Sequence, residues 1–168
     1  MTAREFRPAT LPSFAFAFAR HHPHQEPSMQ FIPYLNFNGN CAEAFAFYAR
    51  LFGGTIVHQS TFGETPGFEQ MPEAGKNLIM HAHLQIKDQA LMASDATDNC
   101  GGGGYQQAQG MWISIGVDDA TEGGRIFNAL AEGGKVTMPF QATFWSPGFG
   151  MVTDRFNTPW MVNVRGEA

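Results

Sequence analysis

The stretch EAFAFYARLFGGTI, Glu43 to Ile56, returns later in the chain as EGGRIFNALAEGGKV, Glu122 to Val136. Placing Gly53 on Gly133 sets the two copies 80 residues apart and brings their apolar residues into register. A repeated supersecondary unit predicts two half-modules that share one core. The space between such halves is where we expect a ligand to bind.

The first copy predicts a helix between strands. Its apolar residues recur at helical spacing, Asn40 stands where a capping side chain is expected, and Gly53-Gly54 provides a left-handed C-terminal cap. Segments rich in β-branched and aromatic residues predict strands. They are residues 31–37 before the helix and residues 55–62, 78–86 and 89–94 after it. The order is therefore βαβββ.

The second copy repeats that order. A strand is expected at residues 111–117, followed by a helix that begins at Asp118-Asp119 and ends at Gly133-Gly134. Further strands are predicted near residues 135–142, 149–153 and 159–164. Two amphipathic helices exclude an all-β protein, and helix-free runs of strands exclude a Rossmann fold. We predict an α+β fold of two tandem βαβββ modules.

Residues 1–28 differ in composition from the rest, with an alternating FAFAFA run at residues 14–19 and the polar HHPHQEPS before Met29. We expect a disordered tail or a start codon assigned too early, with Met29 as the true start. A secretory signal ending at Ala17-Phe18-Ala19 is the less favoured alternative. The domain is expected over 29–168, with module 1 at about 29–98, a linker at 99–109 and module 2 at about 110–165.

The composition restricts the possible partners. A net charge of −5 without a basic stripe argues against nucleic acid. No apolar run approaches the roughly 20 residues that span a bilayer. Two cysteines fit a reducing compartment, so we expect a cytoplasmic protein. Only 15% of residues are charged and 13% are aromatic, which suggests apolar surface that meets a second subunit.

Four stretches carry a family resemblance. They are IPYLNFNGNCAEAFAFYARLFGG at residues 32–54, IMHAHLQI at 79–86, LMASD at 91–95 and GGKVTMPFQATFWSPGFGMVTDRFNTPWMVNV at 133–164. The chain resembles the vicinal-oxygen-chelate (VOC) superfamily, also called the glyoxalase/bleomycin-resistance/dioxygenase fold. Within it the chain is similar to the PhnB-like branch, sometimes labelled 3-demethylubiquinone-9 3-methyltransferase-like. The resemblance implies strands that curl around a cavity, a small-molecule ligand and a homodimer.

The resemblance also implies a divalent metal held by His, Glu or Gln from the first and last strands of each module. In this chain those positions fall near residues 32–33 and 112–113, and near Met92 and Met161. None is a histidine or a carboxylate, and thioethers do not hold hard divalent ions. We therefore expect the usual metal quartet to be missing.

A histidine cluster keeps a metal-dependent alternative open. His81 and His83 are two residues apart on a predicted strand, so both face the same side. His58 on the neighbouring strand and Asp95 could complete a divalent-metal site of a glyoxalase-type lyase, isomerase or dioxygenase. Alternatively, His81 or His83 beside Asp95 could act as a general base without metal.

Aromatic residues predict an apolar pocket, with ordinary core packing as the alternative. The candidate pocket residues are Tyr34, Trp112, Gln141, Phe144, Trp145, Trp160 and Asn163. Cys41 is either an activated nucleophile at a helix start or a buried, inert thiol. The tetraglycine at 101–104 is expected to be a linker, because it lacks the spacing of a nucleotide-binding turn. Methyltransferase activity is therefore not supported.

Three functions remain from the sequence. One is a metal-free protein that binds a small molecule, as bleomycin-resistance proteins of the superfamily do. The second is a metal-dependent enzyme of the glyoxalase type that uses the histidine cluster, and the third is a metal-free enzyme that uses Asp95 or a histidine. We favour the first, assign no cofactor to it, and leave catalysis open.

Overall fold

The computed structural model describes residues 29–97 and 104–166. The chain divides into a unit of residues 1–30, of which only Met29 and Gln30 are described, and a unit of residues 31–168 that contains every helix and strand given below. The predicted tail at 1–28 and most of the tetraglycine lie outside the described residues.

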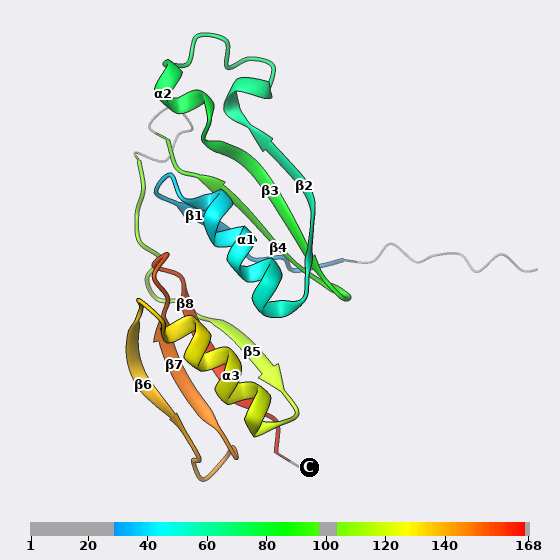
Figure 1. The fold of residues 1–168 in the computed structure, drawn as a ribbon, viewed down its shortest axis with the longest axis vertical. Helices are drawn as coiled ribbons and strands as arrows, with labels where there is room; N and C mark the ends of the chain where they lie inside the picture. The colour runs from blue at the N-terminus through cyan, green and yellow to red at the C-terminus, as the bar shows by residue number, and fades with distance from the viewer. Residues whose placement is uncertain (1–28, 98–103, 167–168) are drawn as a thin grey trace, which may run out of the picture. The chain divides into compact units, whose positions relative to one another are not determined.

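Residues 34–95 form the first βαβββ module (Figure 1). Its four strands make a sheet in the order β1-β4-β3-β2, called sheet A below, in which only the β1–β4 pair is parallel. The elements are β1 (Tyr34–Phe37), α1 (Cys41–Phe52), β2 (Thr55–Thr61), β3 (Ile79–Ile86) and β4 (Gln89–Asp95). The loop between β2 and β3 adds two short helices that the sequence did not predict, η1 (Phe62–Glu64) and α2 (Glu73–Lys76).

Residues 113–164 form the second module with the same topology. Sheet B has the order β5-β8-β7-β6, and again only its first pair is parallel. The elements are β5 (Ile113–Val117), α3 (Ala120–Ala131), β6 (Lys135–Gln141), β7 (Phe149–Thr153) and β8 (Pro159–Val164). The predicted βαβββ repeat is confirmed, although the eight strands form two separate sheets rather than one closed around a cavity.

The glycine pair of the repeat serves two purposes in both modules. Gly53 and Gly133 adopt φ of 66° and 70°, which end the helices in the left-handed region that glycine favours. The following glycines lie against backbone. A Cβ on Gly54 would stand 2.8 Å from the carbonyl oxygen of Gln85, and one on Gly134 would stand 2.5 Å from that of Thr153. The close approach explains why both copies keep two glycines.

The two helices begin differently. Asn40 occupies the N-cap position of α1, but its side chain makes no capping hydrogen bond, so that prediction is wrong. Instead Asp95, at the end of β4, accepts hydrogen bonds from the backbone N–H groups of Cys41 at 3.0 Å and Ile79 at 2.8 Å. In module 2 the cap is local, because Asp119 accepts a hydrogen bond from the N–H of Glu122 at 2.8 Å, and the predicted helix start at Asp118-Asp119 is confirmed.

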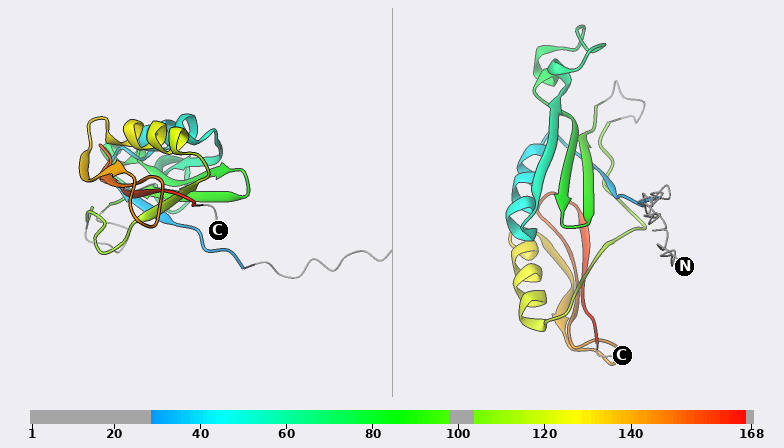
Figure 2. Two further views of the ribbon diagram at one scale, coloured as in Figure 1. Left: turned by 90° about the horizontal axis from the view of Figure 1, so that it is seen from below. Right: turned by 90° about the vertical axis from the view of Figure 1, so that its right-hand side faces the viewer.

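Each helix packs on one face of its own sheet, and one apolar core joins the two modules (Figure 2). The ring of Tyr48 on α1 lies 5.2 Å from that of Trp160 on β8. Beside them the buried carboxylate of Asp154 accepts from the Tyr48 hydroxyl at 2.6 Å and from the Trp160 indole N–H at 2.8 Å. Residues far apart in the chain therefore complete one core.

Among the described residues, no helix is both long enough and apolar enough to cross a bilayer.

Candidate functional site

Each sheet has one face against its helix and one face away from it, called the open face below. In sheet A, Leu35 and Ala93 pair across β1 and β4 and are buried in the core. Tyr34 and Met92, one residue earlier on each strand, also pair and point the other way, because side chains alternate along a strand. Tyr34 is 48% exposed, so the open face is accessible in the chain.

The register places a row of four side chains across the open face of sheet A. In strand order from β2 to β1 the row reads His58, His83, Met92 and Tyr34. His81 lies two residues from His83 on the same face. Its Nδ1 is 3.2 Å from the Tyr34 hydroxyl, and its ring centroid is 5.7 Å from that of His58. The structure thus brings the three predicted histidines to one face, with Tyr34 beside them.

The electrostatics of this face keep His81 uncharged. Burial lowers the pKa of His81 below its ordinary value of 6.5, and the neighbouring His58 and His83 lower it further. A neutral imidazole both donates and accepts a hydrogen bond. The Nε2 atom of His83 is buried and has no hydrogen-bond partner among residues 29–97 and 104–166. The face therefore offers the neutral imidazole of His81 as a hydrogen-bonding group.

Asp95 does not join the histidines. Its side chain is 3% exposed and lies on the helix side of sheet A, where both carboxylate oxygens already accept backbone N–H groups. Strand alternation is the reason, because Asp95 has the parity of Ala93 rather than that of Met92. Over residues 29–97 and 104–166, no three side chains of His, Cys, Asp or Glu are arranged to hold a metal ion.

The resemblance implies metal ligands near residues 32–33 and 112–113 and near Met92 and Met161. Strand register pairs Met92 with Tyr34 of β1 and Met161 with Ser114 of β5, each one residue beyond the predicted first-strand positions. A phenol, a hydroxyl and two thioethers do not make a site for a hard divalent ion, which prefers carboxylate, carbonyl and water oxygens. These residues do not fit the implied metal.

The predicted aromatic pocket is not assembled as expected. Trp160 is 1% exposed and lies on the helix side of sheet B, where its ring packs on Tyr48, so it belongs to the core. Phe144 and Trp145 lie in the turn after β6, 97% and 52% exposed, with their rings 4.5 Å apart. They form a surface pair rather than a pocket wall.

The remaining predicted residues are dispersed over sheet B. Trp112 is half-buried just before β5, and Gln141 is exposed at the end of β6. Asn163 lies on β8 opposite Phe149, and its side-chain oxygen is buried without a hydrogen-bond partner. Asn163 is thus the member of this group with an unused polar atom.

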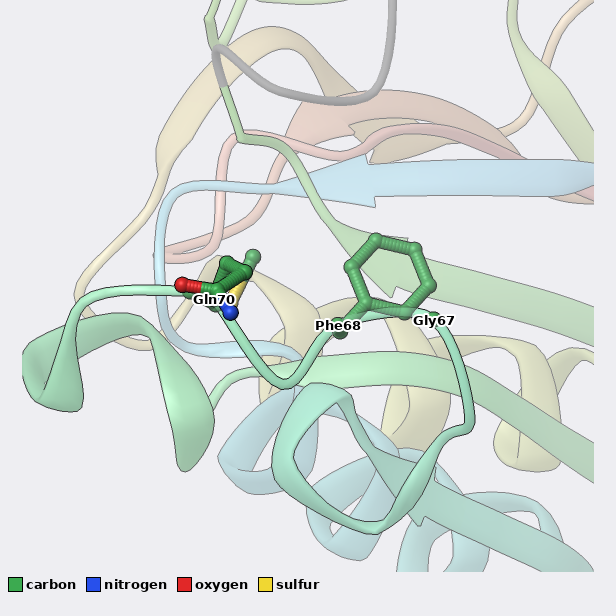
Figure 3. Close-up of a pocket in the computed structure, with 4 residues that line it drawn as sticks. Gly67, Phe68 and Gln70 are labelled. Atoms are coloured by element: carbon green, nitrogen blue, oxygen red, sulfur yellow. The ribbon is translucent and has the colours of Figure 1, made fainter.

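A hollow of about 340 Å³ lies in the loop after β2, and Figure 3 shows residues that line it. It is lined by Gly67, Phe68, Gln70 and Met71, which the sequence analysis had not singled out. The four residues come from one short segment and include no acid, base or nucleophile. This hollow therefore lacks the side chains for chemistry.

The contact between Tyr34 and His81 was also missed from sequence. Alternation alone placed His81 and His83 on one face, which the structure confirms. The partner across the sheet depends on strand pairing, and β1 pairs with β4 rather than with its neighbours in sequence. No local signal in β1 indicates that pairing.

A model of the family described as 3-demethylubiquinone-9 3-methyltransferase matches residues 29–163. Protein YjdN of Escherichia coli K12 is 38% identical over 144 residues, which cover 81% of this chain and 95% of YjdN. Protein PA1353 of Pseudomonas aeruginosa has a crystal structure that is 47% identical, with a TM-score of 0.75, covering 83% of this chain and all of that one.

A glyoxalase-related enzyme from Fulvimarina pelagi is more distant, at 17% identity and a TM-score of 0.55 over 82% of this chain and 89% of its own. At that identity the likeness concerns the fold alone. The family match and the two closer relatives cover both modules and the open face of each sheet. The chain therefore belongs to the family described as 3-demethylubiquinone-9 3-methyltransferase, and it shares its fold with glyoxalase-related proteins.

Proposed function

We propose that the chain binds a small molecule on the open face of sheet A, without the usual metal quartet of the superfamily. The observation that carries the proposal is the contact of 3.2 Å between the Tyr34 hydroxyl and Nδ1 of His81, on a face that none of the described helices covers. His58 and His83 flank this pair. Tyr34 and His81 would orient a ligand through hydrogen bonds, and the apolar atoms of neighbouring side chains would contact the rest of it.

The chemistry of the face indicates the class of ligand. Its strand residues are His, Tyr, Met, Ser, Asn, Gln, Thr and Ala, with no Asp, Glu, Lys or Arg among them. A fixed cation is the usual partner of a phosphate or carboxylate ligand. The exposed ring of Tyr34 offers a surface for stacking. We therefore propose a neutral, flat ligand with hydrogen-bonding oxygens or nitrogens.

The histidine cluster gives less support to a glyoxalase-type enzyme. That alternative needs Asp95, whose carboxylate is engaged on the opposite face of the sheet. The methyltransferase in the family description likewise finds little support. The turn after β1 is Asn38-Gly39-Asn40, with one glycine rather than the spaced glycines of a nucleotide-binding turn.

A homodimer in the cytoplasm is part of the proposal. It is supported by exposed apolar side chains on both modules, among them Tyr34, Val57 and Trp145, and by the low cysteine content. One chain has a mass of 18.4 kDa. Light scattering coupled to size-exclusion chromatography should give twice that mass. A monomeric mass at micromolar concentration would argue against the dimer.

Ligand binding can be tested by a thermal-shift screen of neutral aromatic compounds that carry hydroxyl, carbonyl or amide groups, each beside an anionic analogue. Compounds that raise the Tm of the wild-type chain are then titrated by calorimetry. Tyr34→Phe and His81→Ala should each weaken binding about tenfold, since each loses a hydrogen bond to the ligand. Tyr105→Phe, in the segment before β5, is the matched control and should bind as the wild type does.

Two results would count against this function. One is a screen in which no neutral aromatic compound raises the Tm. The other is a ligand whose affinity does not change in either Tyr34→Phe or His81→Ala. A preference for the anionic analogues would reject the proposed ligand class. The location of the site would then be decided by whether Tyr34→Phe and His81→Ala weaken binding of those analogues.

A further inference from the structure

The open face of sheet B carries a row of three methionines. Met138 of β6 pairs with Met151 of β7, and Met151 pairs with Met161 of β8. Paired residues on neighbouring strands lie about 5 Å apart and point to the same face. In sheet A the corresponding row from β2 to β4 is His58, His83 and Met92. The two modules therefore differ at two of the three positions, where sheet A has imidazole nitrogen and sheet B has thioether sulfur.

The three methionines are not part of the core. Val152 and Val162, their neighbours in sequence, are fully buried on the helix side of sheet B. Met138, Met151 and Met161 are each half-buried, and none belongs to the apolar cluster under α3. The pairing of β6 is irregular on both sides of Met138, so Met138 joins the open face while Phe140 packs on Phe127.

Thioether sulfur is a soft ligand that suits Cu(I) and not hard divalent ions. A methionine side chain is unbranched and turns about three bonds, so three sulfur atoms on neighbouring strands can converge on one ion. Methionine also serves as adaptable apolar surface, but such surface does not require three sulfurs in one cross-strand row. We propose that Met138, Met151 and Met161 form a site for one soft monovalent ion, Cu(I) or Ag(I).

The proposed site makes a prediction that separates it from sites built on histidine or cysteine. Imidazole and thiol ligands must lose a proton before they bind, so their metal affinity depends on pH. A thioether has no proton to lose. The affinity of the methionine row for Ag(I) should therefore stay constant between about pH 6 and pH 8, whereas a histidine site would weaken toward the acid end.

The test is a competition titration of the full chain with Cu(I) against a coloured chelator under anaerobic conditions, repeated with Ag(I) by calorimetry. Every protein carries Cys100→Ser, because a free thiol binds both ions. Cys41 is buried, and burial raises the pKa of its thiol, so it does not compete. We expect the methionine row to contribute one equivalent whose affinity does not change with pH, which separates it from any ion held by imidazole.

Methionine-to-leucine variants keep the volume and remove the sulfur. Met138→Leu, Met151→Leu and Met161→Leu should each lower the affinity at least tenfold, and the triple variant should lose the site. Met92→Leu, in the row of sheet A, is the matched control and should bind as the parent does. Thermal melts verify folding, and if the triple variant does not fold, the three single variants decide the outcome.

The proposal is overturned if the parent chain binds less than about a tenth of an equivalent, or if the folded methionine variants keep the parent affinity. It is also overturned if Met92→Leu loses as much affinity as they do, or if binding weakens steadily from pH 8 to pH 6. The site is independent of the proposed ligand site on sheet A, so neither result bears on the other.

Discussion

Within the described part of the chain, the carboxylate of Asp154 accepts four hydrogen bonds, and none of the donors is a cation. The backbone N–H groups of Phe156 and Thr158 donate to one oxygen at 2.9 and 3.0 Å, while Tyr48 and Trp160 donate to the other. A buried charge is tolerated when its oxygens are satisfied in this way. Asp154 both shapes the turn between β7 and β8 and connects it to α1 in the other module.

Tyr48→Phe should show how much this hydrogen-bond network contributes to the free energy of unfolding. Burial and the nearby Asp154 raise the pKa of Tyr48 well above its ordinary value, so the hydroxyl stays protonated and donates. Removing it leaves a buried carboxylate one donor short, and we expect the free energy of unfolding to fall by about 1.5–3 kcal/mol. Urea unfolding measures the change. Tyr34→Phe, on the open face, is the control and should stay within about 0.5 kcal/mol of wild type; equal losses in both variants would contradict the expectation.

At the scale of elements, the start of α1 depends on a strand that is distant in sequence. Asp95 lies 54 residues from Cys41 and fixes both the helix terminus and the start of β3. Asp95→Asn replaces one accepting oxygen by an amide that faces an N–H group, so the variant should lose about 1–3 kcal/mol of stability. Asp119→Asn, at the N-cap of α3, is the matched control, since asparagine caps a helix about as well as aspartate. Denaturant unfolding of both variants should give a clearly larger loss for Asp95→Asn, and a similar loss for both would exclude this role.

The open face of sheet A should make stability depend on pH. His81 faces His58 from β2, His83 from its own strand and Tyr34 from β1. Its folded pKa is lowered from 6.5, so below about that pH the unfolded chain binds more protons than the folded one. Stability then rises with pH, and its loss begins as the pH falls below about 6.5. The decrease in Tm between pH 7.5 and pH 5.5 should be smaller in His81→Gln than in the wild type. An equal decrease would show that His81 does not contribute.

The helices and strands could be predicted because their signals are local. Apolar spacing and the repeated glycine pair determined α1, α3 and their ends, and most strands lie within two residues of the predicted bounds. The failures involve partners that are distant in sequence. Asn40 was predicted to cap α1, but the backbone N–H of Cys41 donates to Asp95 instead. Trp160 was predicted to line a pocket, but strand alternation directs its ring toward Tyr48 in the core. The rows of histidine and methionine depend on strand register, which the sequence of a single strand does not contain.

For the molecule as a whole, the shared core predicts that neither module folds alone. Tyr48 and Phe52 of module 1 pack on Trp160 of module 2, with centroid distances of 5.2 and 5.6 Å. Separation would expose these rings and leave Asp154 without the Tyr48 hydroxyl. We expect fragments 29–97 and 104–168, expressed separately, to lack a cooperative thermal transition by circular dichroism, and their mixture to recover one. A sharp transition in either fragment alone would contradict this dependence.

The distance along the chain between Tyr48 and its partners also sets a time during synthesis. The hydroxyl of Tyr48 meets Asp154 and Thr158, which are 106 and 110 residues further on. A ribosome adds about 5–20 residues per second, so roughly 5–22 seconds pass between the synthesis of Tyr48 and that of the residues that cover the aromatic face of α1. During that interval the nascent chain exposes apolar rings that can aggregate or recruit a chaperone. The contact that joins the finished modules thus makes the growing chain vulnerable until the last hairpin has been made.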